Sequence, residues 1–391
     1  MQNTLLILGN GFDLECGLKS SFTEFFNACI KDKVSILKEY GDHKVEADGF
    51  WQALLYIYEW KYNQNDYNWF DIEDIIKNTL LNVFIENLNK KSFYEQAKYD
   101  IINDVNNDYN MRKVGMDEYI KSYCKPFIVR KCGYKNKFAN YEEIKKDFAI
   151  DLLFQLKILE NQFCKYMNGQ LVKKEIIGGQ STFKKNEVYF SKAVKLLNNL
   201  VPMIKDKHGD MFISILNFNY TYPINNELKC KIINVHGQLC NKICSQNAIC
   251  LDSNIIFGID DTVISDSKDG IIKNDIKIFS KTYRTLLMSN NAQKILPSKG
   301  SKLVIKFFGH SLNKADYSYF QSIFDYYDIY NNSNVSLEFI YNGEERKNSS
   351  TERVYNLISD YGAKFTNKDQ GKNLMHKLLL EKRISINSLA Y

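Results

Sequence analysis

Two closely spaced glycines near the start of the chain carry the clearest chemical signal. Gly9 and Gly11 directly follow four apolar residues, 5–8. A continuous apolar run that stops at glycines is typical of a buried parallel strand ending in a tight turn. Because glycine has no Cβ, the backbone of such a turn can approach a ligand closely, and a helix that follows presents N–H groups to a phosphate. This stretch predicts a nucleotide site.

The turn departs from the dinucleotide pattern G-x-G-x-x-G, because Leu14 stands where that pattern has its third glycine. An ordinary strand–helix turn with two glycines therefore stays open as the alternative. The helix after the turn is expected to begin after Ser21, which can form a capping box with Glu24.

Polar residues also follow the other expected strands. In a doubly wound sheet, ligands bind at the carboxyl ends of the strands, so these residues are candidates for the site. They are Asn10 and Asp13 after the first strand, Asn219 and Tyr220 after the second, His236 and Gly237 after the third, Asp260 and Asp261 after the fourth, and Gly309, His310, Ser311 and Asp316 after the fifth.

Strands that alternate with helices must position these residues. We expect strands at 4–8, 212–216, 231–235, 254–257, 302–308 and 335–341, and helices at 279–288, 316–329, 351–361 and 372–381. This alternation predicts an α/β fold, a Rossmann-like doubly wound parallel sheet.

The stretch between the first strand and the others has helical periodicity. Apolar stripes recur at 71–88 and 141–171, and a glycine-rich loop precedes a further helix at 188–204. Residues 92–137 are expected to form broken helices and loops. We therefore expect a discontinuous nucleotide-binding domain, residues 1–20 and 206–391, interrupted by a helical insertion, residues 21–205.

The composition argues against several classes of protein. The net charge of +6 is too slight for the dense basic patch that nucleic-acid binding usually needs. No signal-peptide pattern and no apolar run of membrane-spanning length is present, so we expect a cytoplasmic protein that does not bind a membrane. The cysteines near His236, which are Cys240, Cys244 and Cys250, form no CxxC pair, so we expect no metal site.

Taken in order, these blocks resemble the bacteriophage abortive infection AbiH family. The residues that carry the resemblance are Gly9-Asn10-Gly11-Phe12-Asp13-Leu14, Gly17-Leu18, Trp69, Asp71-Ile72-Glu73, Asn217-Phe218-Asn219-Tyr220-Thr221, His236-Gly237, Phe308-Gly309-His310-Ser311-Leu312 and Asp316. The resemblance extends to about Asp325 and implies an effector of phage defence. Such an effector would respond to a phage-derived trigger or a partner defence protein, and we expect a homo-oligomer.

The same blocks are similar to a diverged sirtuin-type domain, which implies NAD as the nucleotide. On this resemblance the cofactor-binding residues are Gly9, Asn10, Gly11, Phe12, Asp13, Gly17, Tyr220, Gly309, His310, Ser311 and Asp316, and the catalytic residues include Asn219 and His236. The chain departs from the sirtuin pattern at Asn10, Asp13 and Thr221, where that pattern has Ala, Ser and Asp.

Cleavage of a nicotinamide–ribose bond passes through an oxocarbenium-like state. Asn219 would hold the water or the ribose hydroxyls, His236 would be the general base, and Asp13 or Glu73 would stabilise the developing cation. Asn219 could instead only fix the backbone of its loop, and His236 could be an ordinary turn residue. Three hypotheses follow: an NAD hydrolase, a non-catalytic nucleotide sensor and a nucleic-acid-directed effector.

Overall fold

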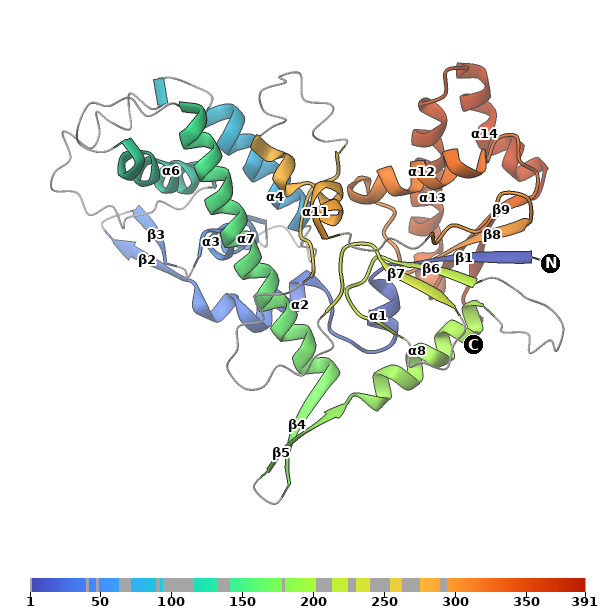
Figure 1. Ribbon diagram of the computed structural model, residues 1–391, viewed down its shortest axis with the longest axis horizontal. Coiled ribbons are helices and arrows are strands. Elements are labelled where there is room, and N and C mark those ends of the chain that lie inside the picture. The colour runs from blue at the N-terminus through green and yellow to red at the C-terminus, as the bar shows by residue number, and fades with distance from the viewer. Residues whose placement is uncertain are drawn as a thin grey trace. The chain divides into compact units, whose positions relative to one another are not determined.

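The chain forms two compact units (Figure 1). The computed structural model describes residues 2–39, 42–46, 49–62, 72–88, 92–93, 116–132, 141–177, 180–201, 213–223, 230–239, 254–261, 275–288 and 294–390. The first unit comprises Met1–Ser20, Met167–Ser245 and Met288–Tyr391, and the second comprises Ser21–Tyr166 and Gln246–Leu287. This division differs from the predicted one, since 167–205 belongs to the sheet unit and 246–287 to the helical unit.

A six-stranded parallel sheet forms the centre of the first unit. Its strands are β1 (Gln2–Leu8), β6 (Ile213–Asn217), β7 (Lys231–Asn234), β8 (Lys302–Phe308), β9 (Val335–Tyr341) and β10 (Ile384–Ser388). They lie in the order β10-β9-β8-β1-β6-β7, which is the classical doubly wound Rossmann order. The strand order reverses between β1 and β8, so that is the topological switch point. The predicted fold class is confirmed.

The burial of the strands explains why they form this sheet. In β1, every residue from Asn3 to Leu8 is buried, as expected of a central parallel strand covered on both faces. β9, which is the second strand from one edge of the sheet, alternates instead between buried and half-buried residues. Three helices supply apolar side chains to the same core as β1, β8 and β9: α12 (Tyr317–Tyr327), α13 (Lys347–Ala363) and α14 (Lys368–Leu380).

Shorter elements complete the first unit. They are α1 (Gly11–Glu15), α8 (Glu187–Leu200), the hairpin of β4 (Val172–Ile177) with β5 (Gln180–Lys185), and the 3-10 helices η5 (Lys314–Asp316) and η6 (Glu344–Arg346). The sequence did not predict the hairpin, which lies where a glycine-rich loop was expected, or β10, whose sequence is short and half polar.

The second unit is mainly helical. It contains α2 (Phe22–Cys29), α3 (Phe50–Tyr62), α4 (Ile72–Leu81), the π-helix η3 (Asn82–Asn87), α6 (Met116–Cys132), most of α7 (Tyr141–Leu171), α11 (Lys281–Met288), the 3-10 helices η1 (Lys31–Lys33) and η4 (Lys277–Phe279), and the hairpin of β2 (Ser35–Glu39) with β3 (Asp42–Glu46). The predicted capping box is confirmed, since Ser21 accepts a hydrogen bond from the Glu24 amide and Glu24 accepts one from the Ser21 amide. The hairpin was not predicted.

The strand predicted at 254–257 is wrong. Ile255, Ile256 and Phe257 are buried, but residues 254–258 form no strand. The Phe257 amide donates to the carboxylate of Glu160 (2.8 Å), and the Phe257 carbonyl accepts from Arg284 (2.9 Å). Because side chains satisfy these backbone groups, the buried segment needs no neighbouring strand.

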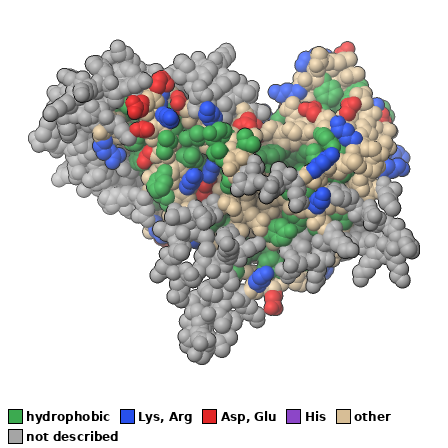
Figure 2. Space-filling view, viewed as in Figure 1, with side chains coloured by type: hydrophobic (Ala, Val, Ile, Leu, Met, Phe, Trp, Pro, Cys, Tyr) green, Lys and Arg blue, Asp and Glu red, His purple; other side chains and the backbone are tan. Residues whose placement is uncertain are grey.

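Figure 2 shows Lys and Arg side chains scattered over the visible face of the described residues, not gathered into one dense patch. Among the described helices, none combines the length and the apolarity that crossing a bilayer requires.

Candidate functional site

Two turns touch at the switch point between β1 and β8. The Gly9 amide donates to the Phe308 carbonyl (3.0 Å), and the Gly11 amide donates to the Gly309 carbonyl (2.8 Å). A Cβ on Gly11 would lie 2.6 Å from the Gly309 Cα, and one on Gly9 would lie 2.6 Å from the Gly309 carbonyl oxygen. Gly309 has a φ of +69°, which glycine adopts readily. The missing side chains therefore allow the two turns to pack together.

The residues around the first turn have different exposures. Asn10 is exposed, and its side-chain oxygen accepts a hydrogen bond from Ser20 (2.5 Å). Phe12 is fully buried and packs edge-on against Phe308. Gly17, which follows α1, has a φ of +88°. Within this turn, the Asn10 side chain is thus accessible to solvent, whereas Phe12 anchors α1.

Asp13 lies in a buried polar cluster that joins three segments. Its carboxylate accepts hydrogen bonds from the hydroxyls of Tyr189 on α8 (2.8 Å) and of Thr221 after β6 (2.9 Å). Burial raises the pKa of Asp13 to about 6, although the two hydroxyl donors lower it. The side chain is only 1 % exposed, so the carboxylate holds α1 in place and does not face a ligand.

Asn219 belongs to a second buried network. Its side-chain amide donates to the Gly9 carbonyl (3.0 Å) and to the side-chain oxygen of Asn217 (3.0 Å). Asn234 donates to the Asn219 carbonyl (2.8 Å). These contacts match the backbone-fixing alternative for Asn219, and they join the ends of β1, β6 and β7. The neighbouring Tyr220 is half-buried.

Asp316 bridges two histidines that follow β7 and β8, two strands that β1 and β6 separate in the sheet. His236 follows β7, and its Nε2 lies 2.8 Å from one carboxylate oxygen of Asp316; His310 follows β8, and its Nε2 lies 3.3 Å from the other. The His310 Nδ1 accepts a hydrogen bond from the Leu312 amide (3.0 Å), so the ring proton lies on Nε2 and faces Asp316. The structure thus brings three predicted site residues together.

An aromatic ring fixes both imidazoles. Phe218 packs edge-on against His236 and His310, with ring centroids 5.4 Å and 4.7 Å away. Both histidine side chains are only 4 % exposed, whereas the Asp316 side chain is 15 % exposed. A carboxylate that orients an imidazole through one ring nitrogen raises the basicity of the other, which is what a general base requires.

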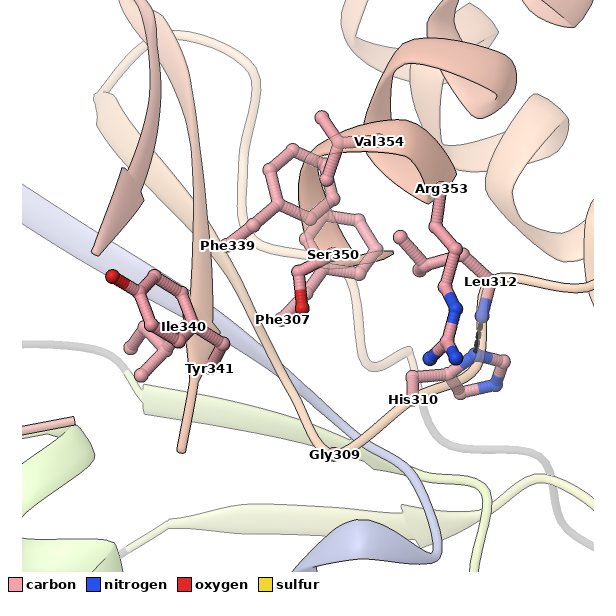
Figure 3. A pocket seen from close by; sticks show the side chains of 10 residues that line it. All are labelled: Phe307, Gly309, His310, Leu312, Phe339, Ile340, Tyr341, Ser350, Arg353 and Val354. Atoms are coloured by element: carbon pink, nitrogen blue, oxygen red, sulfur yellow. Dashed lines mark hydrogen bonds between the residues drawn. The ribbon is translucent and has the colours of Figure 1, made fainter. Parts of the chain in front are cut away.

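A hollow of about 40 Å³ lies beside His310 (Figure 3). Gly309 and His310 line it together with Ser350 and Arg353 of α13. The sequence analysis missed Ser350 and Arg353, because a serine and an arginine within a polar helix give no signal that separates them from ordinary surface residues. Ser311, which was predicted to contact the cofactor, is half-buried in the adjoining loop.

Glu73 lies in the second unit, on α4. Its carboxylate forms an ion pair with Lys281 of α11, whose side chain is buried. Trp69, Asp71 and the cysteines at 240, 244 and 250 lie outside the described residues. Among the residues that the structure does describe, no group of His, Cys, Asp and Glu is arranged to hold a metal ion.

Comparison with known proteins bears on one of the two resemblances. The family model for bacteriophage abortive infection AbiH matches residues 5–341, which confirms the predicted AbiH resemblance. No curated protein and no solved structure matches the chain, and the sirtuin-type similarity stays a prediction. The match spans the sheet strands from β1 to β9 and both histidines of the bridge. The chain belongs to the AbiH family.

Proposed function

We propose that this protein is an effector of phage abortive infection that binds NAD and hydrolyses its nicotinamide–ribose bond. The observation that carries the proposal is the bridge of Asp316 between His236 and His310, beside the switch point of a Rossmann-ordered sheet. Dinucleotides bind at such switch points in doubly wound folds. Membership of the AbiH family supports the role in defence.

His236 is the general base of the proposed reaction. The C1′–N bond breaks and its electron pair passes to nicotinamide, which leaves an oxocarbenium ion on the ribose. Water adds to C1′ and gives its proton to His236, so the products are nicotinamide and ADP-ribose. Asp316 holds the imidazole of His236 through Nε2 and stabilises the imidazolium that forms.

The other predicted catalytic residues do not carry out a chemical step in this proposal. Asn219 and Asp13 are buried among protein partners, so we assign them to holding the turns that surround the site. Glu73 pairs with Lys281 within the second unit, so we assign it no part in the reaction. Asn10, Tyr220, His310 and Ser311 remain the proposed ligand contacts.

Nicotinamide release from NAD by the purified full-length protein tests the proposal. Wild type is expected to release nicotinamide, and His236→Ala to lose about 10²–10⁴-fold in rate, the usual contribution of a general base. His376→Ala is the matched control, because His376 lies on α14 and forms no hydrogen bond or ion pair with His236, His310 or Asp316. Its rate should equal that of wild type.

The outcomes separate the hypotheses. NAD binding without nicotinamide release, with and without a lysate of phage-infected cells, would replace the hydrolase by the nucleotide sensor. Absence of NAD binding by calorimetry would contradict the nucleotide proposal itself. Equal rates for wild type and His236→Ala would contradict the assigned base.

A further inference from the structure

The hollow beside His310 contains one charged side chain, which points into it. Phe307, Gly309, His310, Phe339, Ser350 and Arg353 are among the residues that line it. Figure 3 shows the guanidinium of Arg353 directed from α13 toward the imidazole of His310, with the aromatic rings of Phe307 and Phe339 on the other side. None of the described residues that line the hollow carries a carboxylate. Its electrostatic potential therefore favours an anion.

Arg353 is exposed and has no hydrogen-bond or ion-pair partner among the described residues, whereas three other arginines have one. Arg284 pairs with Glu160, Arg383 with Glu381, and Arg346 with Glu345. The Nδ1 of the neighbouring His310 already accepts from the Leu312 amide, and its Nε2 faces Asp316 at 3.3 Å, so its ring has no free acceptor for the guanidinium. The five N–H donors of Arg353 are thus available to a ligand.

The size and the place of the hollow suit a phosphoryl group. The volume of the hollow, about 40 Å³, exceeds the roughly 10–15 Å³ that one water molecule needs. The hollow is therefore large enough for a group of a few heavy atoms. Gly309 and Tyr341, which line it, stand at the carboxyl ends of β8 and β9. Ligands of doubly wound sheets bind at that edge.

We propose that this hollow is the phosphate subsite of the nucleotide site, with Arg353 binding phosphoryl oxygens and Ser350 donating its hydroxyl. A planar guanidinium matches two phosphate oxygens at once, which an isolated ammonium cannot do. The proposal rests on the proposed function for the identity of the nucleotide, but not for the presence of an anion site. It adds α13 to the elements that make up the site.

Calorimetric titration of the full-length protein tests the subsite with three probes: NAD, nicotinamide riboside and inorganic pyrophosphate. Arg353→Gln should weaken the binding of NAD and of pyrophosphate at least 10-fold and leave nicotinamide riboside, which has no phosphate, unchanged. Arg353→Lys should restore part of the loss. Arg346→Gln is the matched control, because Arg346 precedes the same helix, is exposed and pairs with Glu345. Circular dichroism verifies that the variants are folded.

The results distinguish this proposal from the proposed function. If Arg353→Gln binds NAD and pyrophosphate as tightly as wild type does, the subsite is wrong while NAD binding stands. If wild type binds pyrophosphate through Arg353 but not NAD, the subsite stands and the nucleotide is wrong. If wild type binds neither NAD nor pyrophosphate, both the subsite and the proposed function are wrong. If Arg353→Gln weakens the binding of all three probes equally, the assignment of the hollow to a phosphate is wrong.

Discussion

Burial raises the pKa of Asp13, and this makes the stability of the protein depend on pH. The folded-state pKa of Asp13, about 6, lies above the ordinary aspartate pKa of 3.8, so the folded protein binds a proton more tightly than the unfolded chain does. The free energy of unfolding therefore falls as the pH rises from about 4 to about 6, by an amount of about 3 kcal/mol for this group. Below the unfolded-state pKa the penalty of the buried charge is absent.

Asp13→Asn should remove this pH dependence, because the amide is neutral and of the same size. The thermal midpoint of unfolding, measured between pH 4 and pH 7, should fall with pH in wild type and fall less steeply in the variant. Glu352→Gln, at an exposed position of α13, serves as the control and should follow wild type. Identical slopes for wild type and Asp13→Asn would show that Tyr189 and Thr221 do not hold a carboxylate of raised pKa.

His236 and Asp316 are expected to act as one unit in the reaction. Asp316→Asn keeps the size of the side chain but removes the charge that stabilises a protonated imidazole, so the rate of nicotinamide release should fall by about 10²-fold or more. The double variant with His236→Ala should be scarcely slower than His236→Ala alone, since residues that act together are not additive. Losses that multiply would mean that Asp316 acts independently of His236.

At the scale of elements, the turn after β8 depends on Gly309. A Cβ there would lie 2.5 Å from the Phe12 amide nitrogen, and the φ of +69° adds a conformational cost of about 1–2 kcal/mol for an L-residue. Gly309→Ala should therefore lower the thermal midpoint of unfolding and the affinity for NAD together. Gly300→Ala is the matched control in the same unit, because a Cβ at Gly300 meets nothing within 4 Å. Equal midpoints for the two variants would contradict the role of turn–turn packing.

Local patterns explain which elements the sequence could predict. β1, β8 and β9 are seven-residue strands in which most residues are apolar, and their predicted bounds were nearly right. β10 is a five-residue edge strand with two serines and an asparagine, so it carries no such pattern. Residues 254–257 are as apolar as a strand, but the contacts of Phe257 with Glu160 and Arg284 are long-range and invisible in the local sequence.

The same distinction holds for the candidate site. Residue types at strand ends made His236, His310 and Asp316 candidates for the site, because the carboxyl ends of parallel strands share one edge of the sheet. The pairing itself could not be predicted, since Asp316 lies 80 positions from His236. The sequence likewise could not show that the space beside Gly9 and Gly11 is occupied by the backbone of another turn instead of a ligand.

At the scale of the molecule, all residues of the proposed site lie in the first unit, whereas a buried ion pair stabilises the second. Arg284 of α11 binds both carboxylate oxygens of Glu160 on α7, at 2.5 Å and 2.8 Å, and also the Phe257 carbonyl. Glu160 is 1 % exposed, so removing Arg284 would leave a buried carboxylate without its ion-pair partner and, among the described residues, with only the Phe257 amide as a hydrogen-bond donor. Such a loss costs about 3–5 kcal/mol.

Arg284→Gln should therefore destabilise the second unit while sparing the site. Differential scanning calorimetry should show a lower unfolding temperature than in wild type, and Arg346→Gln, which removes only an exposed pair, should leave it unchanged. Below the transition, pyrophosphate should bind Arg284→Gln and wild type equally, because Arg353, Ser350 and His310 all belong to the first unit. An unchanged unfolding temperature would show that the pair does not hold α7, α11 and the 254–261 segment together, and a loss of pyrophosphate binding at low temperature would show that the anion site depends on the second unit.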